Sequence, residues 1–484
     1  METKTYLEVL LKIYSKKFWF TFALILIWQN PLTTLAQDQV KQYDEGSVYE
    51  GSFKNGLRDG LGKYTMPDGF TYEGEWKNDQ IQGKGVARYP TGQIFEGFFK
   101  QGVPDGEGTM TFSDGTRYNG SWLDGKMEGD GTLNMTDGSV FKGKFSNNNR
   151  DGYGEMNYFD GSIFRGNWKD NEKQGNGTLI YADESTYEGN WEKGLQEGFG
   201  KLSTRDGVVL EGEWKNGRIN GIGRLIQSNG DRYEGNLVDW KRNGKGVSIY
   251  TTGEKYDGNF KDDLRHGKGI LTGQDGFRYE GDWVLGKMSG AGKITYSSGS
   301  IYEGSFENNQ PNGQGKINFS DGGSYEGSWN NGVIEGSGVA KYANGLIYEG
   351  EFSRGKNNGL GTMTYSDGYV YKGSWKNGIQ QGKGEEKFPN GTVYEGEFRN
   401  NQRHGKGTIK MEDGFSYNGD WVSGEMSGKG VAVYANGDKY EGYFLNGKRE
   451  GKGMMTFQDG KIEDAIWKDG KKLKKDTSNS TTDD

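Results

Sequence analysis

The sequence holds few side chains that could carry out catalysis or bind a metal. His266 and His404 are the only histidines, and there is no cysteine. Each histidine directly precedes a glycine, a context typical of a surface turn. Without cysteine, neither a zinc–thiolate site nor a thiol nucleophile can form. The residues therefore predict no catalytic centre, no cofactor and no metal site, and the chain is not expected to be an enzyme.

Glycine pairs give the sequence a superficial likeness to nucleotide-binding proteins. Gly-X-Gly recurs throughout, as at Gly359 and Gly361, but never continues as Gly-X-Gly-X-X-Gly. A phosphate-binding loop also opens a helix, whereas these pairs lie in stretches with strand periodicity. The recurring Asp-Gly pairs lack the D-x-D-x-D-G spacing of a calcium loop. Neither pattern predicts a bound nucleotide or calcium ion.

The glycines instead follow a period of 23 residues. Counting from Tyr49, 18 repeats follow one another without insertion, and the last starts at Tyr440. Positions are numbered here from 0, where 14 repeats have Tyr, three have Phe and one has Leu210. Positions 2, 11 and 13 are Gly in all 18 repeats. A period of this length indicates a repeat array, which folds as one object and not as several domains.

Within a repeat, apolar and polar residues alternate. Tyr348, Gly350 and Phe352 would share one face of a strand, and the run 359–365 repeats the same parity. Position 7 is usually Gly or Asn, and position 20 is Gly in 17 of 18 repeats. Both residue types accept positive φ in tight turns. Each repeat is therefore predicted to form a hairpin, and the array an all-β antiparallel meander of about 18 hairpins.

Position 4 carries the other large rings. Counting Trp467 of a degenerate unit after the eighteenth repeat, it is Trp in ten places, Phe in eight and Leu once, at Leu237. Because rings and bare glycines share one face, a ring can lie over the glycine of a neighbouring strand. Stability is then expected to be a sum of nearest-neighbour contributions along the array.

One zone, residues 184–240, departs from the pattern. Glu184 replaces the turn glycine, Leu210 the first ring and Leu237 the second, while Trp240 stands where a turn Gly or Asn belongs. Sequence drift, in a repeat array that tolerates such substitutions, would account for these changes. The alternative is a bend or a partner site with Trp240 exposed, and Trp240, Leu210 and Leu237 are accordingly the candidate partner-binding residues.

The two ends of the sequence differ from the array. Residues 1–36 combine lysines, a short apolar run (18–28) and small residues suited to a cleavage site that ends at Ala36. This combination predicts a cleaved secretory signal peptide. An uncleaved membrane anchor is the alternative. The array is expected to occupy 37–470, and 471–484 to form a charged polar tail that discourages edge-to-edge pairing.

Charge patterning argues against a nucleic-acid partner. The net charge is −8 and both signs are well mixed, unlike the basic surface of a nucleic-acid-binding protein. Glu recurs at position 1, and Lys at position 5 or 12 (Lys77, Lys406) is placed to pair with such a row. A solvated, charge-laced face is expected opposite the rings.

The motif YEGxW/F, then GxG, then DG in a fixed frame of 23 resembles the MORN (membrane occupation and recognition nexus) repeat family, over about residues 40–470. The resemblance implies an elongated, single-layer, twisted antiparallel sheet with its rings on one side. It also implies a non-catalytic role in scaffolding, partner docking, self-association or membrane attachment.

Together these features predict an exported, non-enzymatic scaffold or binding protein, destined for the periplasm, the cell surface or the medium. It would dock a protein partner, or a second copy of itself, through an aromatic-rich face that a single-layer sheet leaves partly uncovered. The alternative is a peripheral membrane protein that binds phospholipid.

Overall fold

The computed structural model describes residues 39–473. The predicted signal peptide and residues 474–484 of the predicted tail therefore lie outside the described residues. The chain divides between Arg150 and Asp151 into two bodies. Each body consists of strands and tight turns, and no helix occurs between residues 39 and 473. Accordingly, none of the described segments is an apolar helix long enough to cross a membrane.

The N-terminal body (39–150) contains β1 (Gln39–Gln42), β2 (Val48–Lys54), β3 (Leu57–Thr65), β4 (Thr71–Lys77), β5 (Gln80–Arg88), β6 (Ile94–Lys100), β7 (Val103–Thr111), β8 (Arg117–Leu123), β9 (Lys126–Asn134) and β10 (Val140–Ser146).

The C-terminal body (151–473) contains β11 (Asn149–Asn157), whose first two residues precede the division, β12 (Ile163–Lys169), β13 (Glu172–Ile180), β14 (Thr186–Glu192), β15 (Leu195–Ser203), β16 (Val209–Lys215), β17 (Arg218–Ile226), β18 (Arg232–Val238), β19 (Lys241–Ile249), β20 (Lys255–Lys261), β21 (Leu264–Thr272), β22 (Arg278–Val284), β23 (Lys287–Thr295), β24 (Ile301–Glu307), β25 (Gln310–Asn318), β26 (Ser324–Asn330), β27 (Val333–Lys341), β28 (Ile347–Ser353), β29 (Lys356–Thr364), β30 (Val370–Lys376), β31 (Ile379–Lys387), β32 (Val393–Arg399), β33 (Gln402–Lys410), β34 (Ser416–Val422), β35 (Glu425–Val433), β36 (Lys439–Leu445), β37 (Lys448–Thr456), β38 (Ile462–Lys468) and β39 (Lys471–Lys472).

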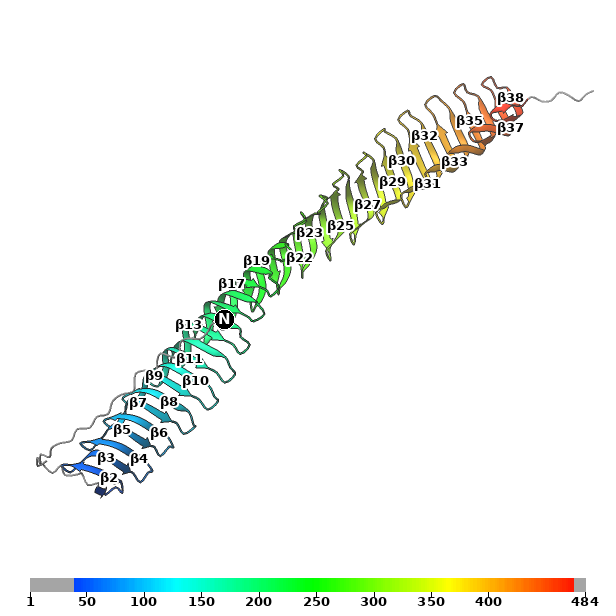
Figure 1. Cartoon of the computed structure of the whole chain (residues 1–484). Coiled ribbons are helices and arrows are strands. Elements are labelled where there is room, and N and C mark those ends of the chain that lie inside the picture. The colour runs from blue at the N-terminus through cyan, green and yellow to red at the C-terminus, as the bar shows by residue number, and fades with distance from the viewer. Residues whose placement is uncertain (1–38, 474–484) are drawn as a thin grey trace, which may run out of the picture. The chain divides into compact units, whose positions relative to one another are not determined.

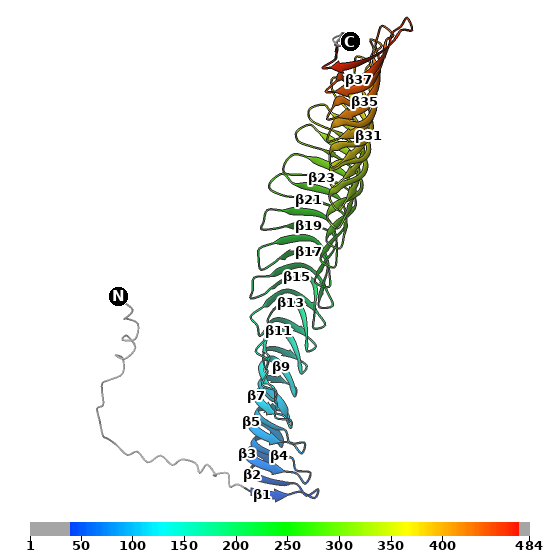
Figure 2. The same ribbon diagram turned by 90° about the vertical axis from the view of Figure 1, so that its right-hand side faces the viewer.

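Strands pair antiparallel with their neighbours in chain order, so each body is an open meander (Figure 1). Each repeat supplies a strand of seven residues and then one of nine, as in β28 and β29. Figure 2 shows the strands of the C-terminal body following one another in sequence order. The predicted all-β array of hairpins is confirmed. The sheet also runs on through β39, so the first two residues of the predicted tail belong to the array.

Two kinds of tight turn connect the strands, as the glycine positions predict. In the two-residue turn between β30 and β31, Asn377 and Gly378 have φ of +52° and +84°, as a type I′ hairpin requires. At position 20, Gly368 has φ +88°, and its N–H donates to the carbonyl of Tyr365. Glu184 takes φ +71° in the equivalent place, a strained conformation for a residue with a side chain.

Each nine-residue strand carries a bulge at the first of its two glycines. Between β30 and β31, Gly373 pairs with Gly384 while Trp375 pairs with Gln380, so β31 has two extra residues. Gly382 lies within this bulge at φ +83°. All 18 glycines at position 11 have φ between +63° and +141°. Glycine adopts this left-handed region without the steric cost that other residues incur, which explains its recurrence there.

The tyrosine at position 0 lies directly over the glycine at position 13. A Cβ added at Gly361 would overlap the Tyr348 phenol, lying 2.6 Å from its Cε2. The Tyr348 hydroxyl, which is fully buried, donates to the carbonyl of Glu351 at 3.0 Å. All 14 tyrosines at this position donate to the carbonyl three residues on. The expectation that rings lie over bare glycines is confirmed.

Rings at positions 0 and 4 form an edge-to-face ladder from repeat to repeat. Tyr348 contacts Phe352 of its own repeat and Trp375 of the next, with ring centroids 5.0 and 5.4 Å apart. The Trp375 indole N–H also donates to the carbonyl of Gly361 at 3.2 Å. Aromatic pairs of this kind stabilise beyond the area they bury.

The ladder is interrupted in the irregular zone. Ring contacts reach Trp214 from Tyr187 and resume between Tyr233 and Phe260, while Leu210 and Leu237 occupy ring positions between them. Trp240, at φ +71°, lays its indole edge-to-face against Trp214 with centroids 5.1 Å apart.

An ion pair with a buried carboxylate interrupts the apolar ring face. Glu386 stands at position 15, where most other repeats have Met, Leu, Ile or Ala, and its carboxylate accepts from Arg403 Nε and from the Tyr369 hydroxyl, each at 2.7 Å. Glu386 is 8% exposed, and the Arg403 guanidinium also stacks over Tyr394 and Trp421. Burial, followed by the hydrogen bond to the Glu386 carboxylate, raises the pKa of Tyr369 well above its usual range.

We expect Arg403→Met alone to lower the free energy of unfolding of this region by about 3–5 kcal/mol, because it strands a buried carboxylate. The double variant Glu386→Met/Arg403→Met should recover most of the loss, since Met363 and Met426 occupy the same two positions in other repeats. Urea unfolding of the full chain measures both. If the double variant is as unstable as the single one, burial of the unpaired carboxylate is not the cause.

Candidate binding surface

The two rows of large side chains at positions 0 and 4 are closed to solvent. Every side chain at positions 0 and 4 is between 0% and 9% exposed, apart from Phe53, which is half-buried. The expectation of a partly uncovered aromatic groove is therefore wrong. The rings of adjacent repeats meet edge to face and cover one another, which parity along a strand does not reveal.

Burial of this row changes the acidity of its tyrosines. It raises the pKa of Tyr233, Tyr256, Tyr302 and Tyr417 to about 12 each, since a phenolate would lose its hydration there. These hydroxyls serve the fold, because each donates to a backbone carbonyl of its own strand.

The three candidate residues divide between core and surface. Leu210 and Leu237 are 3% and 0% exposed, so neither side chain is available to a partner on the surface. Trp240 is 46% exposed and remains a candidate contact. The two leucines fill ring positions in the core, as their place in the frame requires.

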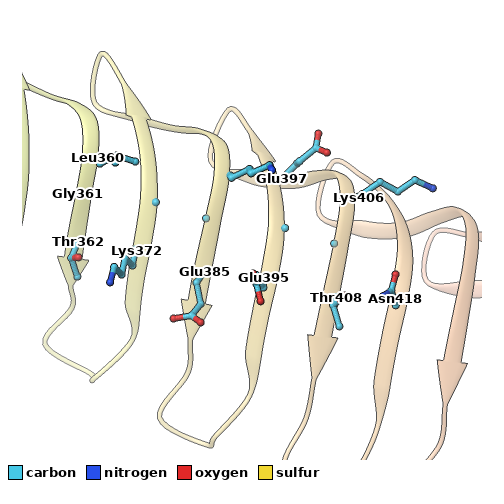
Figure 3. A pocket seen from close by; sticks show the side chains of 15 residues that line it. Leu360, Gly361, Thr362, Lys372, Glu385, Glu395, Glu397, Lys406, Thr408 and Asn418 are labelled. Carbon is cyan, nitrogen blue, oxygen red and sulfur yellow. The ribbon is translucent and has the colours of Figure 1, made fainter.

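Two surface troughs lie on the opposite, polar face, formed by positions 1, 3, 12 and 14, while a smaller hollow of about 740 Å³ on the ring side is lined by Met426, Tyr434, Arg449 and Met455. Shallow troughs run over the glycines of positions 2 and 13, because no side chain rises there. One trough, of about 960 Å³, crosses β29 to β34, and a second, of about 900 Å³, crosses β19 to β24. In Figure 3, Leu360, Glu397 and Lys406 stand on one side of the glycines and Thr362, Glu385 and Thr408 on the other.

Charges on this face pair across neighbouring strands. Lys316 at position 14 lies 3.2 Å from Glu326 at position 1, and Lys268 at position 12 lies 2.8 Å from Asp282 at position 3. The expected charge-laced face is confirmed, although the lysines of position 12 pair with position 3 and not with position 1. These pairs are exposed and contribute about 0–1 kcal/mol each.

Two exposed apolar side chains stand on the polar face within the irregular zone. Phe199 on β15 and Ile222 on β17 occupy position 12 of adjacent repeats and are 58% and 71% exposed. Leu61, Tyr153 and Leu360 are also apolar at this position, at 67%, 62% and 65% exposed, but the repeats next to each of them have a polar residue there. The sequence carried this signal, because an apolar residue at position 12 departs from the polar parity of its strand.

Chemistry beyond binding finds no support in the described part of the chain. No group of three or more His, Asp or Glu residues between 39 and 473 is arranged to hold a metal ion. His266 Nδ1 is buried without a hydrogen-bond partner in that range, and His404 lies in the equivalent place of another repeat, across from Glu397.

Comparison with protein families identifies the repeat. The MORN repeat model matches 18 successive segments, from residues 49–71 to residues 440–462. This chain belongs to the MORN repeat family. Proteins of this family are in general repeat scaffolds or binding proteins without catalytic activity.

Individual relatives of this MORN protein are distant. Alsin from Rattus norvegicus is 40% identical over 52 residues, which are 10% of this chain and 3% of alsin. The TCP domain of SAS-4 from Drosophila melanogaster, solved with a proline-rich motif of Ana2, is 15% identical, covers 42% of this chain and 90% of its own, and has a TM-score of 0.21. A streptogramin B lyase is 17% identical, covers 60% and 90%, and has a TM-score of 0.11. At such scores neither structure carries an argument about fold or function.

Proposed function

We propose that this MORN protein is an exported, non-enzymatic scaffold that binds a protein partner on the polar face of β14 to β18. The observation that carries the proposal is the pair Phe199 and Ile222, whose side chains point away from the filled ring face and are more than half exposed. Exposed apolar groups gathered on a polar surface mark interaction sites. Export rests on the sequence of residues 1–36 alone.

Charge around the pair favours a protein over an anionic membrane. Phe199 lies across from Glu213, and Lys201 lies between Glu188 and Glu211. The surrounding positions hold five carboxylates and two basic groups, namely Glu188, Glu197, Glu211, Glu213, Glu234, Lys201 and Arg224. An acidic rim would repel anionic headgroups and attract a segment with apolar and basic side chains.

The test places a photo-cross-linking amino acid at position 199 or, as a control, at position 360, in cells that produce the protein. The partner captured through position 199 is then purified and titrated against the wild type, Phe199→Ser/Ile222→Ser and Leu360→Ser. We expect the double variant to bind at least about tenfold more weakly, a loss of about 1.4 kcal/mol, and Leu360→Ser to bind like the wild type.

Two results would overturn the proposal. One is equal binding by all three proteins. The other is flotation of the protein with phosphatidylserine vesicles that depends on Phe199 and Ile222 and weakens as salt rises, which would support the phospholipid alternative. Because both side chains are exposed, the substitutions should leave the fold intact, and circular dichroism provides that check.

A further inference from the structure

We propose that copies of this chain join head to tail, with β1 of one copy adding to the free edge of β38 of another. This contact is separate from the partner surface on β14 to β18, so the two can fail independently. Its basis is a match between two strand edges in register and in charge.

Both edges lack a strand partner among residues 39–473. β38 pairs along its length with β37, but on its other side only Trp467 and Lys468 pair with β39. The N–H of Leu473 also donates to the carbonyl of Ile466. The backbone of 462–465 therefore faces outward without a partner strand. β1, also four residues long, pairs only with β2.

The 23-residue frame makes these two edges complementary. β1 occupies positions 13–16 of a nine-residue strand, because it pairs with β2 as β3 pairs with β4. β38 is a seven-residue strand whose positions −1 to 2 are free. Inside the array such positions pair as Val48 with Thr65 and Glu50 with Lys63 do. The same register would place Gln42 opposite Ile462, Lys41 opposite Glu463, Val40 opposite Asp464 and Gln39 opposite Ala465.

Charge favours this pairing over the two alternatives between like edges. Lys41 would face Glu463, whose carboxylate also pairs with Lys472 of its own chain, and Asp464 would lie one residue further along the same edge. Two β38 edges would bring Glu463 and Asp464 against their own copies, and two β1 edges would bring lysines together. Like charges directly across a sheet are destabilising, and such devices commonly prevent unwanted edge pairing.

Shape adds a second requirement. Elsewhere the ring at position 0 excludes any side chain at position 13 of the following strand, as Tyr49 does over Gly62. β1 has Gln39 at that position, so it fits only a short strand that lacks the ring. β38 is such a strand, because Glu463 stands at position 0. Inside the array a Cβ at position 2 would also meet the backbone of the following strand, as an added Cβ at Gly51 would lie 2.5 Å from Cα of Gly62. Because Ala465 and Gln39 replace such a glycine pair, the two strands must be spaced more widely at the junction than within the array.

Apolar exposure at both edges supports coverage by a partner. Val40 is 69% exposed, Ile462 62% and Ile466 52%. In the proposed register Val40 and Ile462 lie at the junction, and association would remove both side chains from water. Strand addition to an exposed sheet edge is a general mode of association, in which the backbone supplies affinity and the side chains supply register.

Cysteine cross-linking of the full chain tests the register without background, because the protein has no native cysteine. We expect a mixture of Val40→Cys and Asp464→Cys proteins to form disulfide-linked dimers at least tenfold faster than either protein alone. A mixture of Val40→Cys with Glu463→Cys is the control, because adjacent residues of a strand point to opposite faces. Absence of the mixed dimer, or equal yields from both mixtures, would overturn the proposal.

Charge reversal and sedimentation velocity supply an independent readout. Lys41→Glu and Glu463→Lys should each weaken association at least tenfold, and a one-to-one mixture of the two should restore it. Lys63→Glu, the same charge change on an exposed residue within the array, should have no effect. If the wild type stays monomeric and associates only after residues 474–484 are removed, those residues occupy the β38 edge and the proposal is wrong.

Discussion

Replacing Gly361 by Ala is expected to destabilise the C-terminal body by about 3 kcal/mol or more, a large effect for one added methyl group. The new Cβ would overlap the Tyr348 phenol, and it could not be relieved by rotating the ring toward solvent because Tyr348 is fully buried. Moving the ring would also break its hydrogen bond to Glu351 and its contacts with Phe352 and Trp375. Urea unfolding and hydrogen exchange in β28 to β31 measure the loss.

Gly378→Ala is the matched control for the Gly361 prediction. Gly378 lies in a turn at φ +84°, and a Cβ there would meet no atom within 4 Å. Its substitution should cost only the backbone strain of a left-handed residue, about 1–2 kcal/mol. Equal losses for the two variants would show that backbone conformation, and not the ring over the glycine, determines stability at position 13.

The second large effect is unfolding at alkaline pH. Because burial raises the pKa of the row tyrosines above 10, the folded chain keeps protons that the unfolded chain releases. Their contribution to stability is therefore complete below pH 10 and is lost as pH rises from 10 through about 12, where Tyr233, Tyr256, Tyr302 and Tyr417 titrate. For each tyrosine, the free energy of unfolding then falls by an amount that approaches about 1.4 kcal/mol per pH unit. Because these losses add over adjacent repeats, neighbouring repeats should unfold together.

Near-ultraviolet absorbance and circular dichroism, recorded on the same samples, check this prediction. Tyrosinate from the buried row should appear together with loss of the strand signal. Tyr302→Phe removes one titrating group, and Phe95, Phe141 and Phe164 show that the frame accepts Phe there. This variant should lower the pH dependence measured in its own repeats. Gradual ionisation of the row without unfolding would contradict the assignment of the raised pKa values to burial.

The sequence predicted the hairpins well because the conformational requirements are local. A turn glycine such as Gly378 or Gly368 indicates a positive φ from its own position alone. Tyr348 and Gly350, two residues apart, indicate which residues share one face of a single strand. The position of a ring over a glycine of the next strand also followed, since rings and glycines share one face of every strand.

Exposure could not be predicted in the same way. Parity puts Tyr348 and Trp375 on one face, but only the spacing between strands shows that their rings meet and exclude water. The aromatic groove was predicted only because a sheet of one layer leaves a face uncovered. The buried rings at positions 0 and 4 contradict that prediction. The ring pattern gives no sign of Phe199 and Ile222, because these two residues depart from the polar pattern of position 12.

The ladders within each body are connected in series, and this has a mechanical consequence. A pulling force applied from one repeat to the next passes in full through the pairing of every two neighbouring strands. The weakest of these pairings therefore limits the force that the whole body withstands. Because the ring contacts are interrupted between Trp214 and Tyr233, with the indole of Trp240 laid over one side of the gap, we expect the C-terminal body to yield first at this place under tension.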